Sequence, residues 1–237
     1  MNNLSNTLNS SIGKKYVMAA TGLFLCVFLL EHLYGNLLLY KADRGLAFIE
    51  YSHTLVHSIL IRIVEVVLFG AIIIHVYQAL KLTTENKNAR KIKYAVSKVD
   101  ETSNWFSRNM GLTGSFILFF LVVHLYTFFV PYRVTETELY PIIKDMKDIT
   151  EGHRNVARDV KIAFGNGFYS SFYLIAILIL GFHLNHGFQS AFQSLGFNNK
   201  TYMPLLQKAG TGFALLITLG FASFPILFYL KLVGQTF

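Results

Sequence analysis

Five long runs of apolar residues constrain the fold of this 237-residue chain more than any other feature. A bilayer core about 30 Å thick needs about 20 apolar residues to be crossed by one helix. Charged residues make up only 14% of the chain, whereas a soluble domain carries about 25%. We therefore predict an all-α integral membrane protein, with residues 1–237 forming one membrane domain. The five transmembrane helices are expected at about 15–40, 56–80, 110–132, 168–193 and 207–231.

Four histidines lie deep inside the first four apolar runs, one in each: His32, His75, His124 and His183. An ionisable side chain at that depth is costly in a membrane helix and usually marks function. For a single histidine, a hydrogen bond to a neighbouring helix would explain it equally well. A set of four, one per helix, is typical of a bundle that binds two haems, each iron being held by two imidazoles. The pattern therefore predicts that the first four helices form a haem-binding bundle for transmembrane electron transfer.

Depth along the helices sorts these histidines into two pairs. Consecutive spans run in opposite directions, so helices one and three run the same way and carry His32 and His124 at similar depths. Helices two and four run back and carry His75 and His183 toward the other side. We expect the pairs His32/His124 and His75/His183. His186 follows His183 by three positions on roughly the same helix face and is the alternative fourth ligand.

An internal repeat relates helices one and three. Helix one carries Thr21-Gly22-x-Phe24 and then His32-Leu33-Tyr34, and helix three carries Thr113-Gly114-x-Phe116 and then His124-Leu125-Tyr126. Eleven positions separate the threonine from the histidine in both. Glycine on a buried face allows close approach of a neighbouring helix or of a flat macrocycle.

The single cysteine, Cys26, narrows the possible chemistry. One cysteine allows no internal disulfide, no iron–sulfur cluster and no covalent CxxCH haem attachment within this chain. Any haem is therefore expected to be held without a covalent link. The polar start MNNLSNTLNSSI, followed by Lys14, Lys15 and a long apolar run, does not match a cleaved signal peptide, so we expect the first helix to direct insertion.

The basic residues of the loops favour one orientation. With five spans, the N-terminus and the loops 81–109 and 194–206 share one face, which carries slightly more lysine and arginine than the other. The compact basic stretch 87–98 lies on it. Cytoplasmic loops are enriched in these residues, so we predict a cytoplasmic N-terminus. The same stretch could instead serve anionic lipid or an acidic partner.

Further ionisable residues have two interpretations each. Arg62 and Glu65 are spaced to pair with each other, but Arg62 could instead reach a haem propionate. Glu31, near the level of His32 and His124, and Glu50, in the loop after the first helix on the side away from the N-terminus, could accept a quinol proton or be ordinary hydrogen-bonded or solvated acids. The remaining histidines are expected at the membrane interface or in a long polar loop: His53, His57 and His153.

The chain resembles a known family in four segments, in order. They are TGLFLCVFLLEHLYGNLLLY, HVYQALKLT, TGSFILFFLVVHLYTF and GFHLNHGFQSAFQSLG. These are similar to the single-chain, dihaem cytochrome b membrane anchor of succinate:quinone oxidoreductases, which include succinate dehydrogenases and quinol:fumarate reductases. The resemblance extends over nearly the whole chain and looks closest to the cytochrome b558-type subunit of menaquinone-using bacteria.

The resemblance implies two haem b groups with iron ligands His32, His75, His124 and His183, paired as above. It implies a flavoprotein subunit with FAD, an iron–sulfur subunit facing the His75/His183 haem, and menaquinone near the other haem, with Glu50 the nearest candidate for the family's quinone-site acid. It places the chain in the bacterial cytoplasmic membrane as a non-catalytic electron-transfer subunit. No nucleic-acid partner is expected. The direction of the reaction, succinate oxidation or fumarate reduction, stays open.

Two other functions are compatible with buried histidines. One is the cytochrome b anchor of another membrane oxidoreductase, of the hydrogenase or formate dehydrogenase type. The other is a proton-coupled transporter, in which histidines and acids relay protons without haem. A transporter would favour an inverted repeat, whereas the repeat here relates two helices that run in the same direction.

Overall fold

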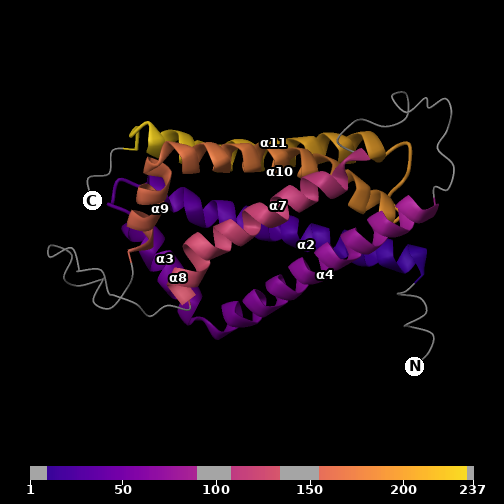
Figure 1. Ribbon diagram of the computed structural model, residues 1–237, viewed down its shortest axis with the longest axis horizontal. Helices are drawn as coiled ribbons and strands as arrows, with labels where there is room; N and C mark the ends of the chain where they lie inside the picture. Colours follow the sequence, from indigo (N-terminus) through magenta and orange to yellow (C-terminus); the bar gives the residue numbers. More distant parts are fainter. Residues whose placement is uncertain (1–9, 90–107, 134–154, 234–237) are drawn as a thin grey trace.

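The computed structural model describes residues 10–89, 108–133 and 155–233. Regular structure within these residues is helical, and the long helices lie side by side along one axis of the molecule (Figure 1). Five of them are long and apolar enough to cross a membrane, which confirms the all-α, multi-pass prediction. The spans are Ser11–Tyr40, Ile59–Asn86, Met110–Tyr132, Gly167–Ser194 and Met203–Tyr229.

Most spans consist of one helix, and two continue into short helical turns. The single helices are α4 (Ile59–Ala89), α10 (Gly167–Ser194) and α11 (Met203–Tyr229). The first span is α2 (Ser11–Leu37) followed by η1 (Leu38–Tyr40). The third is α7 (Met110–His124), followed by a π-helical turn, η2 (Leu125–Phe129), and α8 (Val130–Arg133).

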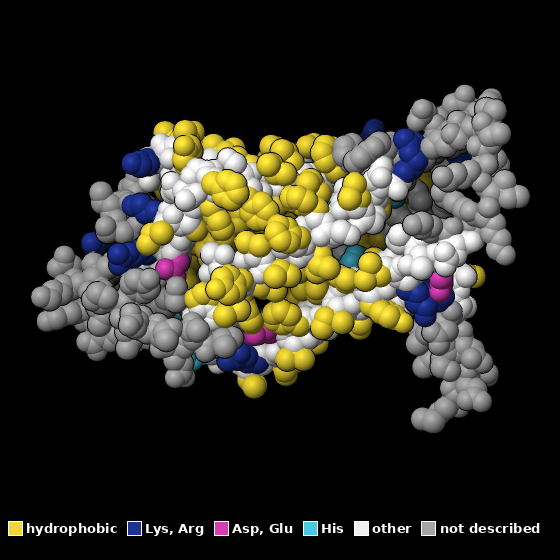
Figure 2. All heavy atoms as spheres, viewed as in Figure 1, with side chains coloured by type: hydrophobic (Ala, Val, Ile, Leu, Met, Phe, Trp, Pro, Cys, Tyr) yellow, Lys and Arg dark blue, Asp and Glu magenta, His cyan; other side chains and the backbone are white. Residues whose placement is uncertain are grey.

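The outer surface suits a lipid environment. Figure 2 shows hydrophobic side chains over the middle of the molecule, with most charged side chains gathered toward its two ends. Large apolar side chains such as Val66, Ile73 and Leu219 are exposed on the helices. In water such an exposed apolar surface would promote aggregation, but in a bilayer it contacts lipid chains at little cost.

Helix α10 lies at the centre of the packing. It contacts α11, α2 and α7, while α4 packs chiefly on α2. Fully buried side chains of η1 and α11, Leu39 and Ile217, belong to a core that also includes Leu33, Ile177 and Phe224. The fifth span is therefore part of the packed bundle and does not stand outside the first four.

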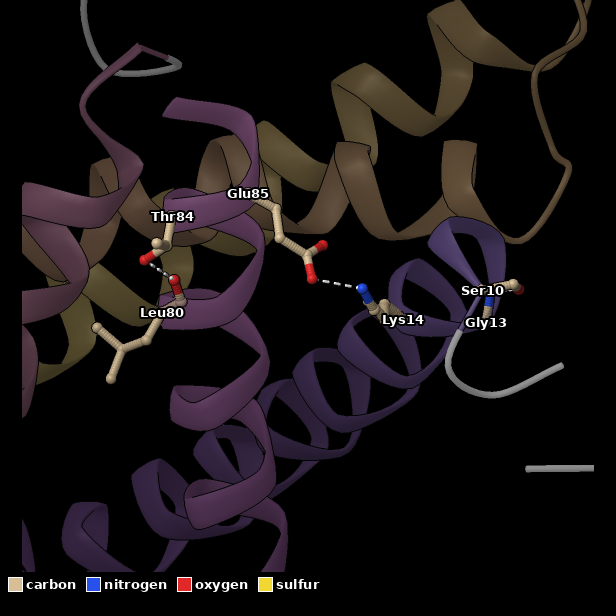
Figure 3. Close-up of polar contacts among 6 residues, drawn as sticks. All are labelled: Ser10, Gly13, Lys14, Leu80, Thr84 and Glu85. Carbon is tan, nitrogen blue, oxygen red and sulfur yellow. Dashed lines mark hydrogen bonds and ion pairs between the residues drawn. The ribbon is translucent and has the colours of Figure 1, made fainter. Parts of the chain in front are cut away.

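The first and second spans are tied together at one end. The Lys14 ammonium lies 2.5 Å from the Glu85 carboxylate (Figure 3), so the start of α2 and the end of α4 share a face, as alternating spans require. Most of the basic stretch 87–98 lies outside the described residues, and so does His153.

Two short helices occupy segments that we expected to be loops. In α3 (Leu46–His57), the Asp43 carboxylate accepts hydrogen bonds from the Gly45 and Ala47 amides at 3.0 and 3.1 Å and caps the first turn. Glu50 is consequently on a helix rather than in a loop after the first helix. In α9 (Val156–Gly165), the Asn155 side chain caps the start, and one face is buried against α10 and α11.

Candidate functional site

Two of the four half-buried histidines meet between α2 and α7. The ring centres of His32 and His124 lie 5.8 Å apart, with their planes at 88°. Phe28 stacks on His32 with ring centres 5.4 Å apart, and Phe221 of α11 lies at 5.5 Å. Because aromatic side chains surround these two histidines, we call them the aromatic pair.

A tyrosine of α10 holds the second member of the aromatic pair. Tyr173, only 4% exposed, places its hydroxyl 3.1 Å from His124 Nδ1, and the Tyr169 hydroxyl donates to Tyr173 at 2.8 Å. The π-helical turn η2 begins directly after His124. Such turns are rare and frequently occur at functional sites.

The other two histidines, His75 of α4 and His183 of α10, lie close enough to interact electrostatically, and His186 lies near His183. A threonine hydroxyl contacts each ring. Thr21 Oγ1 is 3.1 Å from His75 Nδ1, and Thr113 Oγ1 is 3.4 Å from His183 Nδ1. We call His75 and His183 the threonine pair.

Glycines of the internal repeat lie against the same two rings. A Cβ atom added to Gly22 would lie 3.3 Å from His75 Cε1, and one added to Gly114 would lie 3.5 Å from His183 Cε1. Both Thr-Gly dipeptides thus contact a histidine of the threonine pair, while the histidines eleven positions further along the same spans form the aromatic pair. The repeat therefore contributes to both pairs. Its histidines were evident from the sequence, whereas the contacts of its Thr-Gly dipeptides with the threonine pair were not.

The structure brings together His32 and His124, one of the two pairs that depth along the helices predicted. Among the described residues there is no group of three or more His, Cys, Asp or Glu side chains that could hold a metal ion. A haem iron needs only two ligands from the protein. Two imidazoles on one metal, each at a metal–nitrogen distance of about 2 Å, have ring centres about 6 Å apart. The 5.8 Å spacing of the aromatic pair is compatible with this arrangement.

Arg62 lies next to Glu65 on α4, with Nη1 3.6 Å from Oε2. The Arg62 side chain is 52% exposed and that of Glu65 is 20% exposed. Mutual pairing, the simpler of the two interpretations, is therefore present in the structure. Contact between Arg62 and a haem propionate stays a prediction.

The two candidate acids have different surroundings. The Glu31 carboxylate accepts a hydrogen bond from the Tyr51 hydroxyl of α3, and Tyr34 packs edge-on against Tyr51. Burial raises the pKa of Tyr51 above its ordinary value, and the hydrogen bond and charge of Glu31 raise it further. Glu50 is exposed on α3. Two histidines of that helix, His53 and His57, lie with ring centres 4.0 Å apart and their planes tilted by 37°.

No protein-family model, curated protein or solved structure matches this chain.

Several contact residues could not be identified from the sequence. Tyr173 and Phe221 occur in apolar runs rich in aromatic residues, where no spacing marks them as partners of His124 and His32. Tyr51 lies in the segment that we expected to be a loop. The Thr-Gly repeat was visible, but a repeat alone does not reveal which neighbouring helix its side chains face.

Proposed function

We propose that this chain is the dihaem cytochrome b membrane anchor of a succinate:quinone oxidoreductase. In this role it carries electrons between an iron–sulfur subunit and menaquinone. The observation that supports the proposal most strongly is the contact between His32 and His124 inside an apolar bundle, in which His75 and His183 also lie close enough to interact electrostatically. Buried ionisable groups are costly in a membrane, and paired imidazoles are the ligands that hold the iron of b-type cytochromes.

His32 and His124 would hold one haem, and His75 and His183 the other. When bound, each haem supplies a one-electron redox centre whose potential depends on its ligands and their hydrogen bonds. The chain's own residues would bind the haems and orient the histidine ligands. Tyr173, Thr21 and Thr113 fix three imidazole rings, and the aromatic side chains around His32 keep water from that pair.

The proposed assembly includes a flavoprotein subunit with FAD, where succinate is oxidised or fumarate reduced. We place the chain in the bacterial cytoplasmic membrane with its N-terminus cytoplasmic, so that the threonine pair faces the iron–sulfur subunit. Menaquinone would bind toward the aromatic pair. Glu50 remains the acid that the resemblance favours for the quinone site, and Glu31 is the alternative because it lies next to His32.

A pyridine haemochrome assay on the purified full chain, combined with reduced-minus-oxidised spectra, tests the haem content. We expect two b haems per polypeptide. His32→Ala and His124→Ala should remove the same haem, and His75→Ala and His183→Ala the other. His57→Ala, which changes an exposed histidine of α3, is the control and should retain both haems.

One haem in the wild-type chain would mean that one pair is misassigned, with His186 the first residue to re-examine. No haem, in a folded preparation made with adequate haem supply, would overturn the cytochrome proposal and favour proton transport. Co-purification with a flavoprotein and an iron–sulfur subunit distinguishes the proposed complex from a hydrogenase or formate dehydrogenase.

A further inference from the structure

The hydroxyl of Thr21 lies within hydrogen-bond distance of two backbone carbonyls and of the His75 ring. Its Oγ1 donates to the backbone carbonyls of Val17 and Met18, at 2.8 and 3.1 Å. A hydroxyl has one hydrogen, so toward His75 Nδ1 the oxygen presents only lone pairs. With the hydroxyl hydrogen on either carbonyl, His75 is the donor in this contact and carries its hydrogen on Nδ1.

The hydroxyl of Thr113 has the same kind of surroundings. It donates to the carbonyls of Asn109 and Met110, at 3.3 and 3.1 Å, and its lone pairs face His183 Nδ1. The same reasoning puts the hydrogen of His183 on Nδ1. In a neutral imidazole with Nδ1 protonated, Nε2 carries the free lone pair, which is the form that binds a metal.

We propose that Thr21 and Thr113 are positioning residues that hold the two histidines of the threonine pair in the Nδ1-protonated tautomer and strengthen their Nε2 atoms as iron ligands. This inference rests on the proposed function, because it assigns the residues a role toward bound haem. It also gives the Thr-Gly repeat a purpose that helix packing alone does not. Each repeat unit supplies one histidine to the aromatic pair and one hydroxyl to the threonine pair.

The two contacts differ in strength. Thr21 is 3.1 Å from its histidine, but the Met18 backbone also lies close enough to the His75 ring to interact with it. Thr113 is 3.4 Å from His183, a longer and therefore weaker hydrogen bond. Loss of Thr21 would leave the Met18 carbonyl as a replacement acceptor. We therefore expect the double variant to show a clearer effect than either single one.

The hydrogen bond has a defined effect on redox behaviour. An acceptor at Nδ1–H increases electron density on the imidazole and raises the basicity of the ligand. A more basic ligand stabilises ferric iron more than ferrous iron. Removing the acceptor should therefore raise the reduction potential of the haem held by the threonine pair and leave that of the aromatic pair unchanged.

The test uses the full chain with both haems bound. Thr21→Val and Thr113→Val keep the side-chain shape and remove the hydroxyl, while the corresponding serine variants restore it. Thr84 makes the same hydrogen bond to the carbonyl four residues earlier but lies exposed at the end of α4 (Figure 3), so Thr84→Val is the control. The readouts are spectroscopic redox titration and electron paramagnetic resonance of the ferric haems.

In the double valine variant we expect a change of about fivefold in the one-electron equilibrium of one haem, or about 40 mV upward at 59 mV per tenfold. The serine variants and Thr84→Val should match the wild type. Unchanged potentials in the double valine variant, or equal shifts of both haems, would overturn this inference while leaving the dihaem proposal intact. A wild-type chain without haem would instead remove the proposed function itself.

Discussion

The Lys14 ammonium lies 2.5 Å from the Glu85 carboxylate and joins the first turn of α2 to the last turns of α4. The Lys14 side chain is only 10% exposed, whereas that of Glu85 is 44% exposed. This contact closes the end of the helix pair in which Thr21 meets His75. It therefore helps to fix the relative position of the two helices that build one side of the threonine pair.

Glu85→Gln should destabilise the chain by about 1 kcal/mol, because it leaves a mostly buried lysine without a counter-charge while part of the pair is screened by solvent. Lys14→Met combined with Glu85→Gln should recover much of this loss, since no buried charge then remains. Thermal unfolding in detergent measures both. Equal destabilisation by the single and double changes would contradict this explanation.

Gly22→Ala should disturb the threonine pair more than Gly114→Ala. The new Cβ at position 22 would lie 3.3 Å from His75 Cε1, which requires the ring to move by a few tenths of an ångström, whereas 3.5 Å at position 114 is an ordinary contact. We expect a changed ferric haem signal for Gly22→Ala and a nearly unchanged one for Gly114→Ala. Similar spectra for both variants would show that the ring at position 75 has room to adjust.

Tyr51→Phe should lower the melting temperature by an amount that depends on pH. Burial and Glu31 raise the pKa of Tyr51 in the folded chain above the ordinary value of about 10. The stabilisation by the protonated hydroxyl is therefore fully present below pH 10 and is lost as the pH rises through the folded-state pKa. The difference from wild type should be constant between about pH 7 and 9 and shrink above about pH 10.

Tyr34→Phe is the matched control for this measurement, because Tyr34 packs against Tyr51 and both variants remove only a hydroxyl. The difference in melting temperature between Tyr34→Phe and wild type should not shrink above about pH 10. A difference between Tyr51→Phe and wild type that persists at strongly alkaline pH would rule out the Tyr51–Glu31 hydrogen bond as its source.

Gly220→Ala should destabilise the packing of α11 on α2. An added Cβ would lie 2.7 Å from Cδ2 and 2.9 Å from Cδ1 of Leu33, a side chain only 5% exposed. Overpacking of this kind costs about 1–3 kcal/mol. Gly212→Ala, on the same helix with nothing within 4 Å of its added Cβ, should be neutral or stabilising. Thermal unfolding of the two variants provides the comparison, and equal melting temperatures would contradict it.

The spans and the meeting of His32 with His124 could be predicted because both follow from properties that vary along one dimension. Apolar length identifies a span, and alternating direction puts His32 level with His124. Contacts made sideways could not be predicted in the same way. That Thr21 faces His75 and Phe221 faces His32 depends on the rotation of each helix about its axis, which a uniformly apolar sequence does not specify.

The short helix α3 was missed for a different reason. Its length and mixed composition give no membrane signal, and its first turn depends on capping by Asp43. The sequence Asp43-Arg44-Gly45 contains that signal. Asp43 supplies the carboxylate, and Gly45 allows the positive φ of 82° that the backbone adopts directly before the helix. As a result, Tyr51 and its contact with Glu31 were absent from the predicted site.

In α2, Thr21 at the threonine pair and His32 of the aromatic pair are eleven residues apart, and in α7 the same interval separates Thr113 from His124. At 1.5 Å per residue, this interval corresponds to about 16 Å along the axis. The spacing between the two pairs is therefore set by helical rise and not by any loop. Insertions in the loops would leave it unchanged, whereas a single residue inserted within either interval would lengthen it and turn one site about 100° away from the other.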